Sequence, residues 1–516
     1  MTNGAKASTA QALPLASRNI AVLSREGLPP PDAPKWIWDV DHPYLHGIFA
    51  PVDSEYEADG LDIEGELPAD LEGCYVMNSP NQRHQPPGRY HYYDGDGMLH
   101  ALYLRNGTAV YKRRWVNTLA FEHEAKAGEA VWPGLAGPFN FDLPGGPIKD
   151  NSNTDIIFFG GRMLSLWYLA GVPYRIDPHT LQTVGPEDFG GAMPAKLSAH
   201  SKVDPVSGEL IFFDYGNEPV MTYGVAEPNG QLVHQVDIPL PGPRSPHDIG
   251  ITENYAVLHD LPMFQDAEVL KKHGKRIVRF HPDVPARFGV IPRRDNPEDI
   301  RWFEAEPCYL LHVVNTFEDG EWVVMDGCRQ ANPIVDPDPN DGELAKMLAF
   351  RRRVHALYRW RFNLRTGEVR EQQIDDLNTE FPRVNPLRVG RPSRFAYHQY
   401  LPLPEDGTLT GRCQTFDALV KYDTDTGAYQ RYDYGPGVYG NETPFAPRTG
   451  AGATAGEDDG YLVTFSTDTK DWSSHALIFD ATDITRGPIC RIRIPVRIPL
   501  GFHANWIAGT QLWADG

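Results

Sequence analysis

Residues 310–320 read LLHVVNTFEDG, an apolar run that holds one histidine and ends in a polar turn. The residues around the histidine are typical of a buried strand, and the closing Glu-Asp-Gly is typical of a hairpin turn. His312 therefore lies inside a predicted buried strand, where an imidazole needs a partner for each of its two ring nitrogens. A core histidine bonded to nearby backbone is the simplest interpretation, and the rest of the chain must decide between this and a chemical role.

The combination of a turn and a following strand recurs along the chain. It is found in RNGTAVYKRRWV, DPHTLQTV, DPVSGELIFFDY, EPNGQLVHQVDI, EDGEWVVMDG, LRTGEVREQQI and DTDTGAYQRYDY. The strands alternate with period 2, so that Val110, Lys112 and Arg114 share one face. Irregular spacing, roughly 25 to 60 residues, suits a β-propeller with insertions, in which each blade is a small meander. A pair of packed β-sandwiches is the alternative. The sequence predicts an all-β protein.

Helical patterns are scarce. The segments 266–277 and 341–360 are the best candidates for helices, and the cluster Arg351–Arg353 in the second predicts a solvated face. Residues 1–35 are rich in Ala, Ser and Pro and are interpreted as an N-terminal extension, disordered at its start. Residues 36–516 are expected to form a single domain.

Composition narrows the class of protein. The 516 residues carry a formal net charge of -21, which disfavours nucleic acid and anionic lipid as partners. The five cysteines are scattered and form no CxxC pair, which argues against a disulfide framework and a structural zinc site and fits a reducing, cytoplasmic location. No apolar signal-peptide region and no apolar run of transmembrane length is evident.

Four of the 18 histidines occupy strand ends or interiors among small or apolar neighbours: His200, His247, His312 and His503. The chain has no HxH, HExxH or HxxEH pattern, so a compact helical metal site finds no support. Any metal ligands must converge from distant strands. A propeller can bring such positions to one axis, because the inner strands of its blades face a common channel.

Eight stretches in order make the chain resemble a known family. They are YHYYDGDGMLHAL (90–102), KDNSNTDII (149–157), SAHSKVDPVSGEL (198–210), SPHDIGITENYAVLHDLPM (245–263), EPCYLLHVVNTFEDG (306–320), TEFPRVN (379–385), ETPFAPR (442–448) and GFHANWI (501–507). With these stretches the chain resembles the carotenoid cleavage oxygenases, a family that includes the bacterial lignostilbene dioxygenases.

The resemblance implies a seven-bladed β-propeller with a dome of loops and helices over one Fe(II). The ligands carried over are His200, His247, His312 and His503, so that His312 would be buried as an iron ligand. Glu380 and Glu442 match glutamates that accept the outer N–H of His312 and His503. Such partners fix the tautomer and raise the basicity of the ligand. No catalytic residue is implied beyond the iron ligands.

The chain departs from the family at one position near the metal. Many relatives have a third glutamate in the segment matching LSLWYLAGVPYRIDP (164–178), where Leu169 falls near the expected place. His247 then needs another outer partner, such as a backbone carbonyl or water. Asp248 is adjacent, but neighbours in a strand point to opposite faces.

The same segment concerns the substrate. Lignostilbene-cleaving relatives have a lysine there that contacts the substrate phenol, whereas this chain has Trp167 and Tyr168. Tyr168, Trp167 and Lys149 are candidate substrate contacts. The aromatic replacement favours an apolar ligand, and hence a carotenoid or apocarotenoid.

The expected activity is cleavage of an alkene C=C bond with O2 into two carbonyl products, without an organic cofactor. A stilbenoid or phenylpropenoid substrate of the lignostilbene type is the alternative. A propeller binding module without a metal is the rival from another class. A hydrolase with a hard divalent cation would favour oxygen ligands instead. The sequence leaves peripheral membrane contact and the oligomeric state open.

Overall fold

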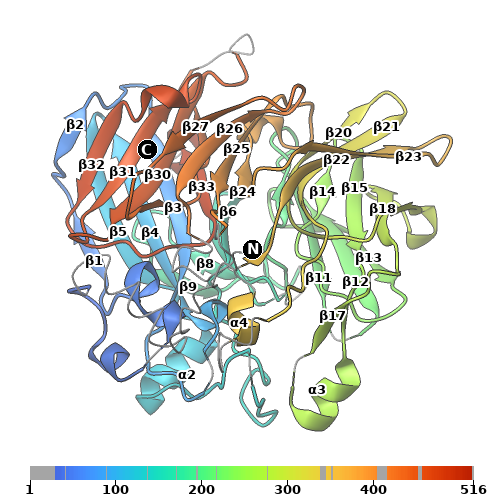
Figure 1. Cartoon of the computed structure of the whole chain (residues 1–516), viewed down its shortest axis with the longest axis horizontal. Helices are drawn as coiled ribbons and strands as arrows, with labels where there is room; N and C mark the ends of the chain where they lie inside the picture. The colour runs from blue at the N-terminus through green and yellow to red at the C-terminus, as the bar shows by residue number, and fades with distance from the viewer. Residues whose placement is uncertain are drawn as a thin grey trace, which may run out of the picture.

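The computed structural model describes residues 30–40, 42–88, 90–135, 137–169, 171–192, 196–216, 218–275, 277–337, 345–349, 352–403, 415–450 and 456–513. Within these ranges, seven antiparallel sheets of four or more strands follow one another around a centre (Figure 1). The predicted all-β class and the seven-bladed propeller are therefore confirmed. A two-stranded ribbon, β16 (Met263–Gln265) with β17 (Val278–Phe280), lies outside the blades.

The first four blades along the chain have these strands. Blade one has β1 (Tyr56–Ala58), β3 (Gly73–Asn81), β4 (Asp96–Arg105), β5 (Thr108–Trp115) and β33 (Ala504–Ala508). Blade two has β6 (Asp155–Phe159), β7 (Arg162–Leu166), β8 (Tyr174–Ile176) and β9 (Thr183–Pro186). Blade three has β10 (Lys202–Val203), β11 (Leu210–Tyr215), β12 (Val220–Ala226) and β13 (Leu232–Pro239). Blade four has β14 (Gly250–Ile251), β15 (Tyr255–Asp260), β18 (Ala286–Pro292) and β19 (Arg301–Ala305).

The last three blades complete the ring. Blade five has β20 (Tyr309–Asp319), β21 (Trp322–Gln330), β22 (Ala356–Asn363) and β23 (Val369–Asp375). Blade six has β24 (Thr379–Arg383), β25 (Phe395–Tyr400), β26 (Ala418–Asp423) and β27 (Tyr429–Asp433). Blade seven has β2 (Ile63–Gly65), β28 (Val438–Gly440), β29 (Phe445–Pro447), β30 (Gly460–Asp468), β31 (Ser474–Asp480) and β32 (Cys490–Ile494).

The recurring turns are hairpin turns in the structure. The stretch LLHVVNTFED (310–319) lies in β20, and the chain reverses through Gly320 into β21, with Asp319 opposite Trp322. Gly320 has φ of 61°, in the left-handed region that glycine adopts without a steric penalty. The local turn residues thus place the hairpins, and the alternating strands build the blades.

The two ends of the chain close the ring. Strand β33 near the C-terminus pairs with β3 of blade one, with Trp506 opposite Tyr75. In the other direction, β2 near the N-terminus pairs with β32 of blade seven. In Figure 1 the blue and red strands accordingly lie side by side. Backbone hydrogen bonds from remote parts of the chain therefore hold blades one and seven together.

The hydrophobic core lies between neighbouring blades. Trp360 of β22 is fully buried, and its ring lies 5.4 Å from that of Phe288 in β18 of the preceding blade. Phe362 packs in the same cluster. Each sheet thus buries apolar side chains against the next sheet, as face-to-face packing of twisted sheets requires.

Helices occupy one side of the propeller. They are α2 (Leu119–Ala127), α3 (Ala267–His273) and α4 (Ala345–Ala349), at the bottom of Figure 1, while α5 (Gly509–Leu512) follows β33. The helix predicted within 266–277 is confirmed as α3. The prediction of a helix over 341–360 is wrong at its C-terminal end, because residues 356–360 belong to β22. Their pairing between β21 and β23 overrides the local helical pattern.

The described end of the N-terminal segment is fastened to the propeller. The Asp32 carboxylate lies 2.9 Å from Arg497 Nε and 3.4 Å from Arg113 Nη1. Residues 1–29 lie outside the described ranges, and the boundary at residue 35 remains a prediction.

Candidate metal centre

Four histidines from four blades meet at one point. His200 and His247 precede β10 and β14, His312 lies in β20, and His503 precedes β33. All four are buried, and their candidate ligand nitrogens lie within 4.8 Å of one another. The ring centroids of His200 and His503 are 4.4 Å apart, and those of His247 and His312 are 5.1 Å apart. Residues 303 positions apart in the chain thus share one small volume.

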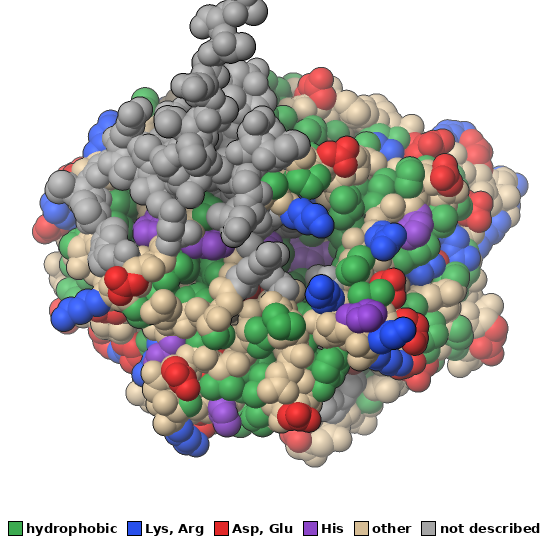
Figure 2. Space-filling model, turned by 60° about the horizontal axis from the view of Figure 1, so that its bottom comes forward, with side chains coloured by type: hydrophobic (Ala, Val, Ile, Leu, Met, Phe, Trp, Pro, Cys, Tyr) green, Lys and Arg blue, Asp and Glu red, His purple; other side chains and the backbone are tan. Residues whose placement is uncertain are grey.

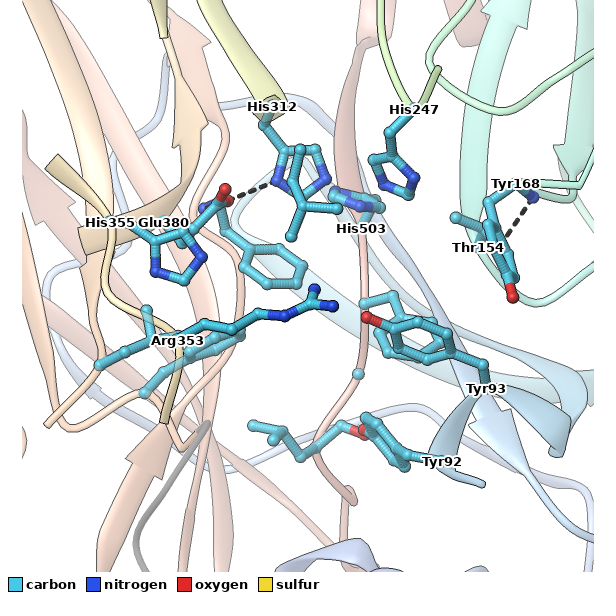
Figure 3. Close-up of a pocket in the computed structure, with 17 residues that line it drawn as sticks. Tyr92, Tyr93, Thr154, Tyr168, His247, His312, Arg353, His355, Glu380 and His503 are labelled. Carbon is cyan, nitrogen blue, oxygen red and sulfur yellow. Dashed lines mark hydrogen bonds and ion pairs between the residues drawn. The ribbon is translucent and has the colours of Figure 1, made fainter. Parts of the chain in front are cut away.

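Carboxylates hold the outer nitrogens of two of these rings. His312 Nδ1 is bonded to the Glu380 Oε2 of β24 (Figure 3), and His503 Nδ1 lies 3.0 Å from Glu442 Oε1, between β28 and β29. An ionised carboxylate only accepts hydrogen bonds, so each Nδ1 carries the proton. The lone pair is then on Nε2, the nitrogen available to a metal.

A third carboxylate, Asp155, escaped the sequence analysis. Its Oδ2 lies 3.4 Å from His200 Nδ1 and accepts the backbone N–H of His200 at 3.3 Å. Asp155 starts β6, inside the stretch KDNSNTDII, and is buried at the head of the apolar run DIIFF. In the sequence, the only local signal was an aspartate directly before the apolar run IIFF.

Each blade contributes one residue to this centre. In blade order they are His503, Asp155, His200, His247, His312, Glu380 and Glu442, all at or beside the first or last strand in the sheet order. These strands are therefore the inner strands that face the propeller axis.

His247 differs from the other three histidines. In the part of the chain that the structure describes, no carboxylate pairs with it. Asp248 points elsewhere, because it lies 2.6 Å from Lys202 Nζ and accepts the backbone N–H of Val313 at 2.8 Å. Leu169 packs against an apolar cluster, and the Tyr168 ring lies 5.9 Å from the His247 ring.

The donor set fits a transition metal. The Nε2 atoms of His200 and His312 are buried and have no hydrogen-bond partner among the described residues. Buried polar atoms without a partner are costly, and lone pairs that face one another need a cation or a proton between them. Imidazole nitrogens suit iron, zinc, copper and nickel, whereas calcium and magnesium prefer oxygen.

Most of the four imidazoles are neutral at neutral pH. Burial and the neighbouring His503 lower the pKa of His200 to about 4, although Asp155 opposes them. Burial also holds the pKa values of His247 and His503 well below the usual value. Burial lowers the pKa of His312 as well, but the Glu380 carboxylate outweighs it and leaves this pKa raised. His312 is therefore the ring that keeps a proton most readily when no metal is bound.

Two residues of the centre have unusual backbone conformations. His200 has φ of 65° and Phe381, next to Glu380, has φ of 53°. Residues other than glycine rarely adopt such φ values, and each such conformation costs about 1–3 kcal/mol. The turn at His200 directs its ring toward the axis, and Phe381 stacks on His503 with ring centroids 4.8 Å apart.

A cavity opens beside the histidines. It encloses about 60 Å³, several times the roughly 10–15 Å³ that one water needs. Its wall is mainly aromatic and apolar and includes Tyr92, Tyr93, Tyr168, Phe381, Phe416 and Phe502. Figure 2 shows the helix-bearing side, where histidine side chains are visible inside a hollow. The cavity can hold an apolar ligand next to the metal centre.

The candidate substrate contacts divide between two places. Tyr168 lines the cavity, but Trp167 and Lys149 line a separate small pocket. Lys149 is buried there, bonded to Asp96 and 2.6 Å from Glu124 Oε2. Lys149 is therefore paired with two carboxylates in the second pocket and does not line the histidine cavity.

The sequence analysis also missed two polar residues of the cavity wall, Arg353 and His355. Arg353 had been assigned to a solvated face, and the structure corrects this. Its guanidinium extends into the cavity (Figure 3). The error follows from interpreting 341–360 as one helix, since Arg353 and His355, directly before β22, line the cavity instead. Arg351 lies outside the described residues.

None of the described helices is long and apolar enough to cross a membrane.

Comparisons with known proteins match most of the chain. The family model described as "Retinal pigment epithelial membrane protein" matches residues 49–508. Carotenoid 9,10(9',10')-cleavage dioxygenase 1 of Phaseolus vulgaris is 33% identical, over 93% of this chain and 92% of the relative. Isoeugenol monooxygenase of Pseudomonas nitroreducens is 28% identical, over 90% of this chain and 98% of the relative.

Solved structures with a similar fold include two oxygenases. Pseudomonas brassicacearum lignostilbene dioxygenase has a TM-score of 0.80 at 29% identity, covering 91% of this chain and 99% of that one. A variant of the Synechocystis apocarotenoid oxygenase has a TM-score of 0.78 at 27% identity, covering 89% of this chain and 97% of that one.

Proposed function

The chain belongs to the carotenoid cleavage oxygenase family, and from this premise we propose that it is a non-haem Fe(II) dioxygenase. It cleaves an alkene C=C bond of a carotenoid or apocarotenoid with O2 and yields two carbonyl products. The observation that carries the proposal is the set of four buried imidazoles with ligand nitrogens within 4.8 Å of one another.

His200, His247, His312 and His503 would hold the iron. Fe(II), when bound, supplies the redox chemistry between O2 and the alkene. The other residues of the centre hold protons and orient rings: Glu380, Glu442 and Asp155 keep Nδ1 protonated on His312, His503 and His200. Four neutral imidazoles would leave the full charge of Fe(II) uncompensated by its ligands, and this donor type suits iron rather than the hard cations calcium and magnesium.

The cavity supplies binding, orientation and exclusion of water. Aromatic side chains such as Tyr93, Phe381 and Phe502 present flat apolar surfaces that suit a conjugated alkene. Holding the double bond beside the histidines replaces a bimolecular encounter by a positioned reaction. A ligand that fills the aromatic cavity would displace water, which strengthens local electrostatic interactions.

A stilbenoid or phenylpropenoid substrate is the second candidate. It is favoured by the polar residues Arg353 and His355 in the cavity wall, which a pure hydrocarbon would leave unused. The lignostilbene dioxygenase and isoeugenol monooxygenase among the similar proteins support it.

The test is a reconstitution followed by a substrate panel. Protein purified without metal is loaded anaerobically with Fe(II), and carotenoids, apocarotenoids, stilbenes and phenylpropenoids are offered with O2. We expect one iron per chain and aldehyde products from at least one class. A His312→Ala variant should lose both iron and turnover. Absence of iron after reconstitution would support the rival interpretation, a propeller that only binds a partner.

We also propose a cytoplasmic location. The four cysteines in the described part of the chain are free and buried, and burial raises the pKa of the Cys308 thiol to about 12. Free thiols persist in reducing compartments. Recovery of the protein from the cytoplasmic fraction with unmodified thiols is expected, and recovery from an oxidising compartment would contradict the proposal.

A further inference from the structure

The geometry points to His355 as the residue that recognises a hydroxyl group on the substrate, with Asn378 fixing its tautomer and Arg353 completing the polar end of the cavity. This inference rests on the proposed function and adds a chemical requirement: the alkene carries an alcohol or a phenol. His355 precedes β22 and Asn378 precedes β24, so neighbouring blades five and six form this end.

The orientation of the Asn378 amide is fixed by its partners. Its Nδ2 donates to the backbone carbonyl of Leu401 at 2.8 Å, which makes the other amide atom the oxygen. This oxygen accepts the backbone N–H of His355 at 2.8 Å and lies 3.0 Å from His355 Nδ1. Because a carbonyl oxygen only accepts, Nδ1 of His355 must carry the ring proton.

The other nitrogen of His355 is therefore an acceptor. His355 is only 4% exposed, and no described residue donates a hydrogen bond to its Nε2. Burial keeps this ring neutral by lowering its pKa. A buried acceptor without a donor is destabilising, so its place in the cavity wall calls for a ligand that donates.

Glu380 offers a second acceptor in the same wall. Its Oε2 takes His312 Nδ1 and the backbone N–H of Phe381, at 2.6 Å for the latter, but its Oε1 has no partner among the described residues. In Figure 3 His355 lies beside Glu380, with the Arg353 side chain below them. Two acceptors and a guanidinium, which brings N–H donors, thus surround one end of an otherwise aromatic cavity.

A hydroxyl satisfies these groups better than an anion does. Its proton can be donated to His355 Nε2, and its oxygen can accept from Arg353. A carboxylate could pair with Arg353, but it has no proton for His355 and would be repelled by the nearby Glu380 carboxylate. A methoxy group accepts without donating, and this provides the discriminating comparison.

The experiment compares matched substrates that carry a hydroxyl or a methoxy group on the same skeleton. One arm uses a phenolic stilbene and the other a hydroxylated apocarotenoid, which distinguishes the two sources of the hydroxyl. For iron-loaded wild-type protein we expect kcat/KM to favour the hydroxyl member of one arm by about 10–100-fold. Saturated analogues cannot be cleaved, and their binding can be measured by the quenching of tryptophan fluorescence. This binding should show the same preference for the hydroxyl member.

Variants of His355 test whether its ring causes the preference for the hydroxyl substrate. His355→Phe keeps the ring shape but removes the acceptor, so the hydroxyl-to-methoxy ratio should fall to near one with iron content unchanged. His355→Gln keeps an acceptor near Nε2 and should retain part of the ratio. His398→Phe is the matched control: His398 in β25 is equally buried, contacts Thr379 at 3.2 Å and does not line the cavity, so its removal should leave the ratio intact.

The outcomes separate the two proposals. If neither member of either pair is cleaved by protein with full iron, the proposed function fails. If both members are cleaved and bound equally well by wild-type protein, a buried water serves the acceptors and the inference about His355 is overturned. The same holds if His355→Phe folds, binds iron and keeps the wild-type ratio.

Discussion

At the scale of single residues, the centre depends on which nitrogen of each histidine carries the proton. Glu380, Glu442 and Asp155 face Nδ1 of three rings and leave Nε2 for a metal. His355 follows the same rule with an amide oxygen in place of a carboxylate. One elementary property, that these oxygens accept and do not donate, thus sets both the nitrogens proposed to bind the metal and the proposed hydroxyl contact.

Replacing Asp155 tests the partner that only the structure supplied. Asp155→Ala leaves His200 Nδ1 without its acceptor, and the loss of such a partner typically weakens metal affinity or activity about 10–100-fold. Competition with a chelator under anaerobic conditions measures the affinity. Asp237→Asn, an exposed aspartate in β13 bonded to Thr222, is the control and should match the wild type. Equal iron affinity in both variants would show that Asp155 does not support metal binding by His200.

Iron affinity should depend on pH through His312. A metal binds only the neutral ring, in which Nε2 carries no proton, and Glu380 raises the pKa of His312 above its usual value. Affinity should therefore be constant above this raised pKa and fall by about tenfold per pH unit below it, with a further fall near the pKa of His200, about 4. Chelator competition from mildly alkaline to acidic pH measures this.

The variant Glu380→Gln checks the cause of that pH dependence. Without the carboxylate the pKa of His312 drops, so the onset of the affinity loss should move to lower pH, while affinity itself decreases. Glu368→Gln, an exposed glutamate paired with Arg370, should change neither. An onset that stays at the same pH in Glu380→Gln would contradict the assigned role of this carboxylate.

At the scale of elements, each blade combines a structural task with one contribution to the centre. The alternating strands bury apolar side chains between blades, and the inner strand of each blade presents one histidine or carboxylate to the axis. Positive-φ backbone conformations, in the turn at His200 and within β24 at Phe381, direct side chains to the centre rather than into the core. The packing that holds the blades is therefore separable from the chemistry.

Trp360→Ala tests this separation. Trp360 is fully buried between β22 and the preceding blade, so its removal should lower the free energy of unfolding by about 3–5 kcal/mol. Urea denaturation followed by circular dichroism measures the loss. Trp322→Ala is the control, since Trp322 is half-buried under the Arg370 guanidinium and should cost less than about 1 kcal/mol. We expect the folded Trp360 variant to keep its iron, and loss of iron at full folding would show that packing and site are coupled.

At the scale of the whole molecule, closure of the ring joins the two ends of the chain. Beyond the pairing of β33 with β3, Asp32 bridges Arg113 in β5 and Arg497 after β32, two guanidinium groups that are almost completely buried. Arg497 also donates to the carbonyl groups of Ala50 and Pro51. A single carboxylate thus compensates two buried charges at the seam between the first and last blades.

Asp32→Ala should destabilise this seam. Removing one partner of a buried ion pair costs about 3–5 kcal/mol, because the remaining charges stay buried without compensation. The midpoint of urea denaturation is expected to fall, while Asp39→Ala, at an exposed position in the same segment, leaves it unchanged. A normal midpoint for Asp32→Ala would mean that closure depends on the strand pairing alone.

The sequence by itself determined the all-β class, the positions of the hairpins and which four histidines meet at the axis. Alternation and turn residues such as Gly320 act locally, and the ordered motifs extend over almost the whole chain. The tertiary structure alone decided which groups meet. It brought Asp155 to His200, Asn378 and Arg353 to the cavity end, and Lys149 to Asp96 and Glu124. It also turned residues 356–360 from a helical pattern into a strand. Such contacts join positions far apart in the chain, and no local spacing records them, because only the closing of seven blades around one axis fixes their distances.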